Sequence, residues 1–155
     1  MKKIVVATNN QGKLKEIKEI LKEYELVTLK EIGCNIKVEE DQETFEGNAK
    51  KKAEEIAKVT NLPVLADDSG LVIEALDGFP GVHTARFLGE DATDAQRNEA
   101  ILEKMKGLKK EQRKAKVACV VAYYEKGKFI IGKGEIEGTI AKKPRGERGF
   151  GFDPI

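Results

Sequence analysis

Two adjacent aspartates are the strongest candidates for chemistry in this sequence. Asp67 and Asp68 follow the apolar run Val64-Leu65-Ala66 and precede Ser69-Gly70. Neighbouring carboxylates at the end of a buried strand repel each other and are costly to remove from water. A hard cation relieves that cost, and Mg²⁺ binds one or two carboxylates together with substrate phosphates and waters. The pair predicts a site where a carboxylate activates water beside a metal ion. An ordinary surface turn is the alternative.

The polar loop Thr8-Asn9-Asn10-Gln11-Gly12-Lys13 is the second candidate, as a phosphate-binding segment. It joins a short apolar run to a helical pattern, and the N-terminus of a helix favours anions through its free N–H groups and its dipole. Lys13 adds a full positive charge at the same place. The glycine and lysine spacing of a P-loop is absent. The alternative is a turn in which Asn10 only caps the helix.

An acidic run, Glu39-Glu40-Asp41, precedes a second helical pattern. It is either a source of a further metal carboxylate or a solvated face whose charges suit a helix N-terminus. The choice between Glu39 and Glu40 as ligand stays open, because adjacent residues of a strand face opposite sides.

The glycine-rich segment at residues 145–154 is the fourth candidate. Its glycines let the backbone approach a ligand closely. Phe150 or Phe152 can stack on a base, and Asp153 can accept hydrogen bonds from base N–H groups. A flexible basic loop is the alternative.

Hydrophobic periodicity predicts the elements that must position these groups. Short β-branched runs favour buried strands, and apolar residues at helical spacing favour amphipathic helices. Early alternation of strand and helix followed by a late hairpin is typical of an α/β protein with a mixed sheet. The predicted strands cover residues 4–7, 27–29, 36–38, 64–66 with a brief continuation at 71–73, 116–124 and 129–136. The predicted helices begin at Lys13, after the acidic run with Phe45 on the inner face, and near Thr93 or Asp94.

Composition narrows the function classes. The chain has 155 residues, a length that suits one domain, and its 28 basic and 27 acidic residues leave a net charge of +1. Such a balance gives no general attraction for nucleic acid. Cys34 and Cys119 lack metal-ligand spacing and favour a reducing cytoplasm. We find neither a signal-peptide pattern nor a run of about 20 apolar residues, so we expect a cytoplasmic protein that does not enter a membrane.

Taken together and in this order, the motifs resemble the inosine triphosphate pyrophosphatase family, also called the Ham1-like or XTP/dITP diphosphatase family. The resemblance covers nearly the whole chain. The matching stretches are residues 7–13, 44–49, 66–71, 80–86, 89–94 and 149–154.

The resemblance implies a fold and a reaction. The fold is an α/β architecture with a long mixed β-sheet and flanking helices, forming two lobes around a cleft. The reaction is the hydrolysis of ITP, dITP and XTP to the monophosphate and pyrophosphate, by metal-activated water attack at the α-phosphorus. The implied role is cleansing of the nucleotide pool by a Mg²⁺-dependent homodimer.

The resemblance also implies roles for single residues. Thr8, Asn9, Asn10, Gln11, Gly12 and Lys13 would hold the triphosphate, with Asn10 and Lys13 as chief contacts. Glu39 or Glu40 would bind Mg²⁺ with Asp68, supported by Asp67, and Asp68 would also be the general base. Ser69 would touch the substrate. The purine would stack on Phe150 in a pocket lined by Gly151, Phe152 and Asp153.

The family pattern continues beyond Asp153-Pro154 with a further strand and helix. That segment carries a substrate lysine and a Ser-His-Arg motif that reads the purine 6-oxo group. We therefore expect residues 1–155 to form a single two-lobed nucleotide pyrophosphatase domain that lacks this C-terminal segment. A truncated nucleotide-binding core without activity is the alternative function.

Overall fold

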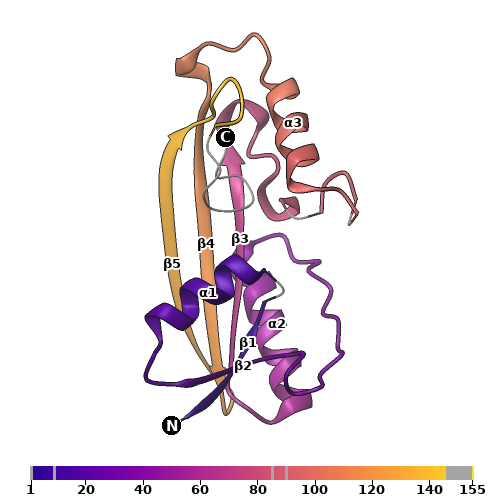
Figure 1. The fold of residues 1–155 in the computed structure, drawn as a ribbon, viewed down its shortest axis with the longest axis vertical. Coiled ribbons are helices and arrows are strands. Elements are labelled where there is room, and N and C mark those ends of the chain that lie inside the picture. Colours follow the sequence, from indigo (N-terminus) through magenta and orange to yellow (C-terminus); the bar gives the residue numbers. More distant parts are fainter. Residues whose placement is uncertain (1, 9, 85, 90, 146–154) are drawn as a thin grey trace. The chain divides into compact units, whose positions relative to one another are not determined.

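The structure is a computed structural model that describes residues 2–8, 10–84, 86–89, 91–145 and 155. Five strands form one sheet in the order β2-β1-β3-β4-β5 (Figure 1). The predicted α/β class with a mixed sheet is confirmed. The elements are β1 (Lys3–Ala7), α1 (Gln11–Ile20), β2 (Glu25–Thr28), α2 (Phe45–Thr60), β3 (Val64–Ile73), α3 (Asp94–Lys104), β4 (Lys114–Glu125) and β5 (Lys128–Thr139).

The chain divides into two compact units. The first unit comprises Met1–Asp68 and Cys119–Lys133, and the second comprises Ser69–Ala118 and Gly134–Ile155. No helix among the described residues is long and apolar enough to cross a membrane.

The sheet combines parallel strands with a hairpin. β1 pairs in parallel with β2 and with β3, and Ala7 lies opposite Ala66. β4 and β5 are neighbours joined by Lys126 and Gly127, whose φ angles of 48° and 81° suit the tight turn of an antiparallel hairpin. The predicted hairpin is therefore confirmed.

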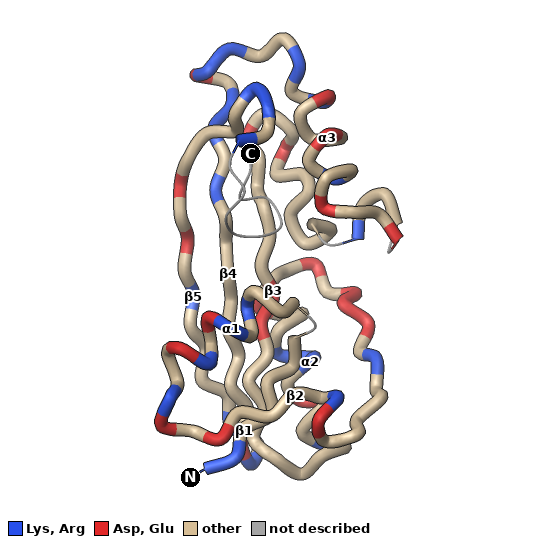
Figure 2. Tube along the Cα trace, in the orientation of Figure 1, with Lys and Arg blue, Asp and Glu red and all other residues tan. Residues whose placement is uncertain are grey.

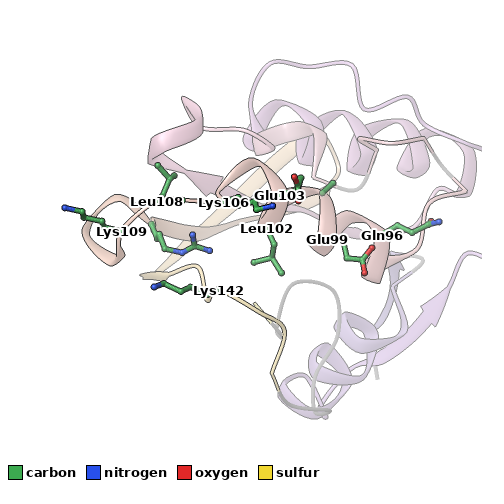
Figure 3. Close-up of a pocket in the computed structure, with 11 residues that line it drawn as sticks. Gln96, Glu99, Leu102, Glu103, Lys106, Leu108, Lys109 and Lys142 are labelled. Carbon is green, nitrogen blue, oxygen red and sulfur yellow. The ribbon is translucent and has the colours of Figure 1, made fainter.

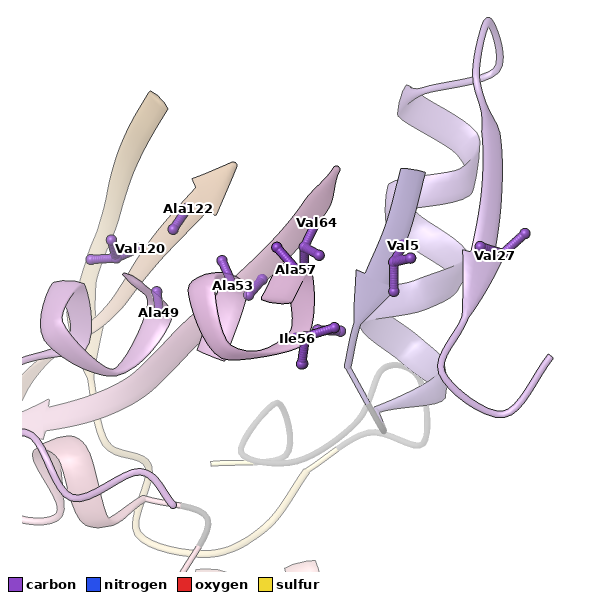
Figure 4. Close-up of a cluster of buried hydrophobic side chains, with 11 residues drawn as sticks. Val5, Val27, Ala49, Ala53, Ile56, Ala57, Val64, Val120 and Ala122 are labelled. Carbon is purple, nitrogen blue, oxygen red and sulfur yellow. The ribbon is translucent and has the colours of Figure 1, made fainter. Parts of the chain in front are cut away.

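Helix α2 provides the core of the first unit (Figure 4). Its alanines and Ile56 pack against one face of the strands, and the small alanine side chains let the helix lie close to the sheet. The buried cluster contains Val5, Ala7, Val27, Ala49, Ala53, Ile56, Ala57, Val64, Ala66, Val120 and Ala122. Val64 and Ala66 belong to this cluster, so alternation along β3 places Asp68 on the same face and Asp67 on the opposite face.

Each α-helix begins after a polar cap, and α1 starts at Gln11, two residues before the predicted start at Lys13. The side chain of Asn10 accepts a hydrogen bond from the Lys13 N–H at the start of α1, and Thr44 does the same for Gly47 in α2. Thr93 forms a reciprocal capping box with Gln96 at the start of α3.

The structure differs from the predicted strands in two places. Residues 36–38 form no strand. The side chains of Ile36 and Val38 pack on the core cluster, but the backbone of this segment does not pair with a strand. The run at residues 64–66 does not end before the aspartates, since β3 continues without a break to Ile73.

A separate core holds the second unit together. It comprises Leu71, Ile73, Ile101, Met105 and Ile140. The buried guanidinium of Arg113 donates hydrogen bonds to the backbone carbonyls of Met105, Ile140 and Ala141, which ties the end of α3 to the segment after β5.

Candidate functional site

The polar loop after β1 and the two aspartates of β3 lie at neighbouring strand positions in the first unit. Ala7 pairs with Ala66, so Thr8 and Asp67 each follow the last paired residue of two parallel strands. Within the loop, the Thr8 hydroxyl accepts a hydrogen bond from the Asn10 N–H at 3.1 Å. The Asn10 side chain accepts from the Lys13 N–H, also at 3.1 Å. The loop therefore presents the N-terminus of α1 beside the aspartates.

Asp67 and Asp68 are buried residues of a strand, with relative exposures of 6% and 8%. The alternative of a surface turn is therefore wrong. Their side chains lie on opposite faces of β3 and contact different partners. The Asp67 carboxylate forms an ion pair of 2.8 Å with the ammonium group of Lys13 in α1. Asp68 accepts a hydrogen bond of 3.0 Å from the Asn48 amide in α2.

Asn48 connects Asp68 to the acidic segment. Its side chain is completely buried, and its oxygen accepts a hydrogen bond of 2.9 Å from the Gln42 N–H. The segment that precedes α2 carries the acidic run from Glu39 to Glu43, visible as the cluster of acidic positions in Figure 2. The Asn48 amide therefore bonds both the acidic segment before α2 and Asp68.

Lys52 forms a second connection between the same parts. Its ammonium group lies 2.6 Å from the Glu40 carboxylate and donates a hydrogen bond of 2.8 Å to the backbone carbonyl of Asp67. The side chains of Lys52 and Glu40 are only 18% and 22% exposed. A half-buried cation beside a buried carboxylate pair can attract a phosphate group as well as hold Glu40.

Sequence reasoning assigned no role to Asn48 or Lys52. The two residues are separated by four positions in α2, the spacing that places side chains on one face of a helix. That spacing, one turn after the Thr44 cap, is the signal that could have found them.

The structure distinguishes the surroundings of the two glutamates. Glu39 is exposed, whereas Glu40 is half-buried and paired with Lys52. Among the described residues no group of three or more His, Cys, Asp or Glu side chains gathers as a ready set of metal ligands. Glu40 and Asp68 offer the carboxylate oxygens that hard divalent cations prefer, and Mg²⁺ commonly completes its shell with water and phosphate.

The surroundings shift the pKa of two other groups, Asp41 and Cys119. The hydrogen bond from Lys51 is the main reason that the pKa of Asp41 is lowered, with a smaller contribution from Gln42. Burial raises the pKa of the Cys119 thiol, and the negative charge of Asp67 acts in the same direction. Asp41 therefore stays ionised in the acidic segment, and Cys119 stays a neutral thiol.

The remaining predicted residues lie apart or outside the described part of the chain. Gln11 and Gly12 form the first turn of α1, and Ser69 follows Asp68 in β3 as the first residue of the second unit. Asn9, Phe150, Gly151, Phe152 and Asp153 lie outside the described residues.

A cavity of about 930 Å³ lies in the second unit (Figure 3). Helix α3 and the segment after it form most of its wall, with Lys142 on the other side. None of the predicted site residues that the structure describes lines it. The lining residues are Gln96, Glu99, Ala100, Leu102, Glu103, Lys106, Gly107, Leu108, Lys109, Arg113 and Lys142.

Comparison with known proteins adds independent findings. The model of the Ham1 family matches residues 4–155. The chain is 48% identical over 160 residues to the dITP/XTP pyrophosphatase of Bacillus subtilis, with all of this chain and 80% of that protein covered. It is also 48% identical over 156 residues to the dITP/XTP pyrophosphatase of Thermus thermophilus, covering 99% of this chain and 74% of the relative.

Solved structures show the same similarity. The HAM1 protein from Coxiella burnetii superposes with a TM-score of 0.89 at 42% identity, covering 100% of this chain and 81% of that one. The Ham1 protein of Staphylococcus aureus superposes with a TM-score of 0.87 at 41% identity, covering 99% and 80% respectively.

Proposed function

The chain belongs to the Ham1 family, and we propose that it hydrolyses the non-standard purine nucleoside triphosphates ITP, dITP and XTP to the monophosphate and pyrophosphate. Relatives at 41–48% identity over nearly the whole chain carry the name dITP/XTP pyrophosphatase. The observation that carries the proposal within the site is the buried Asp68 carboxylate, held by Asn48 close to the Lys52–Glu40 pair.

Positive groups for the triphosphate come from two helices. Lys13 lies in the first turn of α1, where the helix dipole also favours an anion. Lys52 lies in α2 with its ammonium group against the Asp67 carbonyl. Two cations suit a substrate with several negative charges better than one with a single charge. Thr8, Asn9, Asn10, Gln11, Gly12 and Ser69 complete the proposed phosphate contacts.

Glu40 and Asp68 are the residues that would hold Mg²⁺. Their carboxylate oxygens suit this hard ion, and few protein ligands are needed when phosphates and waters complete the shell. When bound, the ion would neutralise charge on the phosphates. Glu39 is less suited because its side chain is exposed. Asp67 is less suited because it faces the other side of β3 and pairs with Lys13.

Asp68 is the general base of the reaction. It takes a proton from water while the water oxygen forms a bond to the α-phosphorus. The bond from the α-phosphorus to the oxygen that bridges to the β-phosphorus breaks, and pyrophosphate leaves with that electron pair. A base oriented by a donor such as Asn48 contributes typically 10²–10⁴-fold to such a step. In the same proposal Phe150 stacks on the purine, and Gly151, Phe152 and Asp153 line the base pocket.

The proposal extends to the setting of the reaction. The protein acts as a homodimer in the cytoplasm, on nucleotides and not on nucleic acid. The two cysteines are free thiols, as a reducing compartment requires. The net charge of +1 gives no general attraction for nucleic acid. Analytical ultracentrifugation tests the dimer, and a monomer at micromolar concentration contradicts it.

Pyrophosphate release from ITP, dITP and XTP tests the proposed reaction, with and without Mg²⁺ and with ATP and GTP as controls. We expect metal-dependent release that favours the three non-standard nucleotides. Nucleotide binding without any release would support the alternative of a binding core without activity, which the names of the relatives do not favour.

A further inference from the structure

Asn48 is a completely buried polar side chain whose two ends bond to different parts of the site. Its oxygen accepts from the Gln42 N–H at 2.9 Å, and its nitrogen donates to Asp68 at 3.0 Å. A buried amide is stable only when its polar atoms are satisfied. Both bonds therefore matter to the position of the side chain.

The partners determine which way the amide points. The Gln42 N–H can only donate, so the oxygen of Asn48 must face it. The amide N–H₂ group then points at the Asp68 carboxylate, which can only accept when ionised. A flipped amide would place donor against donor at one end and oxygen against oxygen at the other. The bond to Gln42 therefore fixes the orientation of the Asn48 amide, and this orientation directs its N–H₂ group to Asp68.

The acidic segment before α2 lies close to the first turn of the helix at Gln42. A Cβ atom added at Gly47 would meet the Gln42 side chain and the Thr44 hydroxyl, each at 3.0 Å. Glycine at position 47 lets Gln42 lie against the first turn of the helix, next to Asn48. Because Gln42 is two residues from Glu40, the position of Gln42 limits where Glu40 can lie.

We propose that Asn48 is a positioning residue that sets the Asp68 carboxylate relative to the loop carrying Glu40. The proposal rests on the proposed function, in which these two carboxylates bind the metal ion and Asp68 is the base. Asn48 touches neither substrate nor metal in this role. It acts by holding the two ligands at a constant separation through one rigid amide.

A purely structural role for Asn48 has less support. The first turn of α2 already has its cap, since Thr44 accepts from Gly47. The loop already has two tethers to the helix, the pairs Lys51–Asp41 and Lys52–Glu40. What Asn48 adds to these contacts is its bond to Asp68.

The test uses Asn48→Leu, which keeps the approximate volume and removes both hydrogen bonds. Partners that orient metal ligands typically affect metal affinity or activity by 10–100-fold when they are removed. We expect the kcat for XTP to fall by a factor in that range. The Kd for Mn²⁺ alone, measured by titration calorimetry, should rise by about tenfold or more. Circular dichroism and thermal unfolding establish that the variant is folded.

A double-mutant cycle separates positioning from general damage. In the Asp68→Asn background, Asn48→Leu should reduce kcat by less than about twofold, because residues that act through one group are not additive. The same factor of loss in both backgrounds would overturn the proposal. An unchanged Kd for Mn²⁺ in folded Asn48→Leu would overturn it as well, since a loss of folded protein lowers kcat without changing a Kd.

Lys51→Ala is the matched control on the same helix. It removes the exposed pair with Asp41 and leaves both bonds of Asn48 in place. We expect its kcat and its Kd for Mn²⁺ to stay within about twofold of wild type. A loss equal to that of Asn48→Leu would assign the effect to loop tethering and contradict the role of Asn48. If the wild type releases no pyrophosphate, the proposed reaction fails, and the Mn²⁺ titration alone decides the role of Asn48.

Discussion

The ammonium group of Lys13 lies 2.8 Å from the Asp67 carboxylate, on the face of β3 opposite to Asp68. Because Asp67 is 6% exposed, this pair is largely removed from solvent and its geometry is well defined. The two adjacent aspartates therefore have separate surroundings, a lysine for Asp67 and an amide for Asp68. In the proposed function, Asp67 orients a cation for phosphate and Asp68 acts on water.

Asp67→Asn should weaken substrate binding more than it slows the chemical step. The variant removes the charge that holds the Lys13 ammonium group, so Lys13 is less well oriented toward the triphosphate. We expect KM for XTP to rise by about tenfold with a smaller change in kcat, the behaviour of a lost binding contact. Steady-state kinetics measures both constants. A fall in kcat at unchanged KM would instead place Asp67 with the catalytic carboxylates.

Asp68→Asn should abolish turnover while the fold is retained. An amide cannot take the proton from water, and loss of a general base typically reduces kcat by 10²–10⁴-fold. Asn at this position can still accept the hydrogen bond from Asn48, so the unfolding temperature should change little. Pyrophosphate release and thermal unfolding measure the two effects. Turnover near the wild-type value would exclude Asp68 as the base.

Lys52→Met should reduce kcat/KM because it removes a half-buried cation and the ion pair that this cation forms with Glu40. Loss of one preorganised charge at a reacting phosphate is expected to reduce the rate by about 10²–10³-fold. Lys51→Met is the matched control, because Lys51 is the neighbour of Lys52 and pairs with the exposed Asp41, the neighbour of Glu40. Equal activity of the two variants would show that the position of Lys52 has no special role.

The sequence predicts the local elements of the site better than the directions of its side chains. The loop at residues 8–13, the cap at Asn10 and the hairpin around Gly127 follow from local turn and capping chemistry. The two aspartates are predicted at the end of a buried strand, beside a hard cation. Instead β3 runs from Val64 to Ile73, so alternation separates them.

Long-range contacts explain what sequence reasoning missed. Strand alternation does not distinguish Glu39 from Glu40, because these residues lie in an irregular segment. Glu40 is distinguished by Lys52, a contact with a residue of the following helix. The contact between Asn48 and Asp68 spans 20 residues and depends on how α2 packs on the sheet. Neither is a property of a local pattern.

Arg113→Met should destabilise the protein without changing the proposed active site. The Arg113 guanidinium is 4% exposed and donates to the carbonyls of Met105, Ile140 and Ala141. Methionine can fill the space of the side chain but removes the guanidinium donor from the carbonyls of Ile140 and Ala141, at about 1–3 kcal/mol for each unsatisfied group, while the Met105 carbonyl still accepts from the Leu108 N–H. We expect the free energy of unfolding in urea to fall by about 2 kcal/mol or more.

The exposed Lys109 provides the control for the loss of stability in Arg113→Met. Lys109 lines the same cavity as Arg113, so Lys109→Met also removes a charge there but keeps the three hydrogen bonds of Arg113. Its free energy of unfolding should stay within about 0.5 kcal/mol of wild type. At a temperature where Arg113→Met is still folded, its KM for XTP should equal that of the wild type, since Arg113 bonds only to backbone carbonyls and is none of the residues proposed to contact the substrate. An unfolding energy unchanged by Arg113→Met would show that the carbonyls find other donors, and the end of α3 would then not depend on this guanidinium.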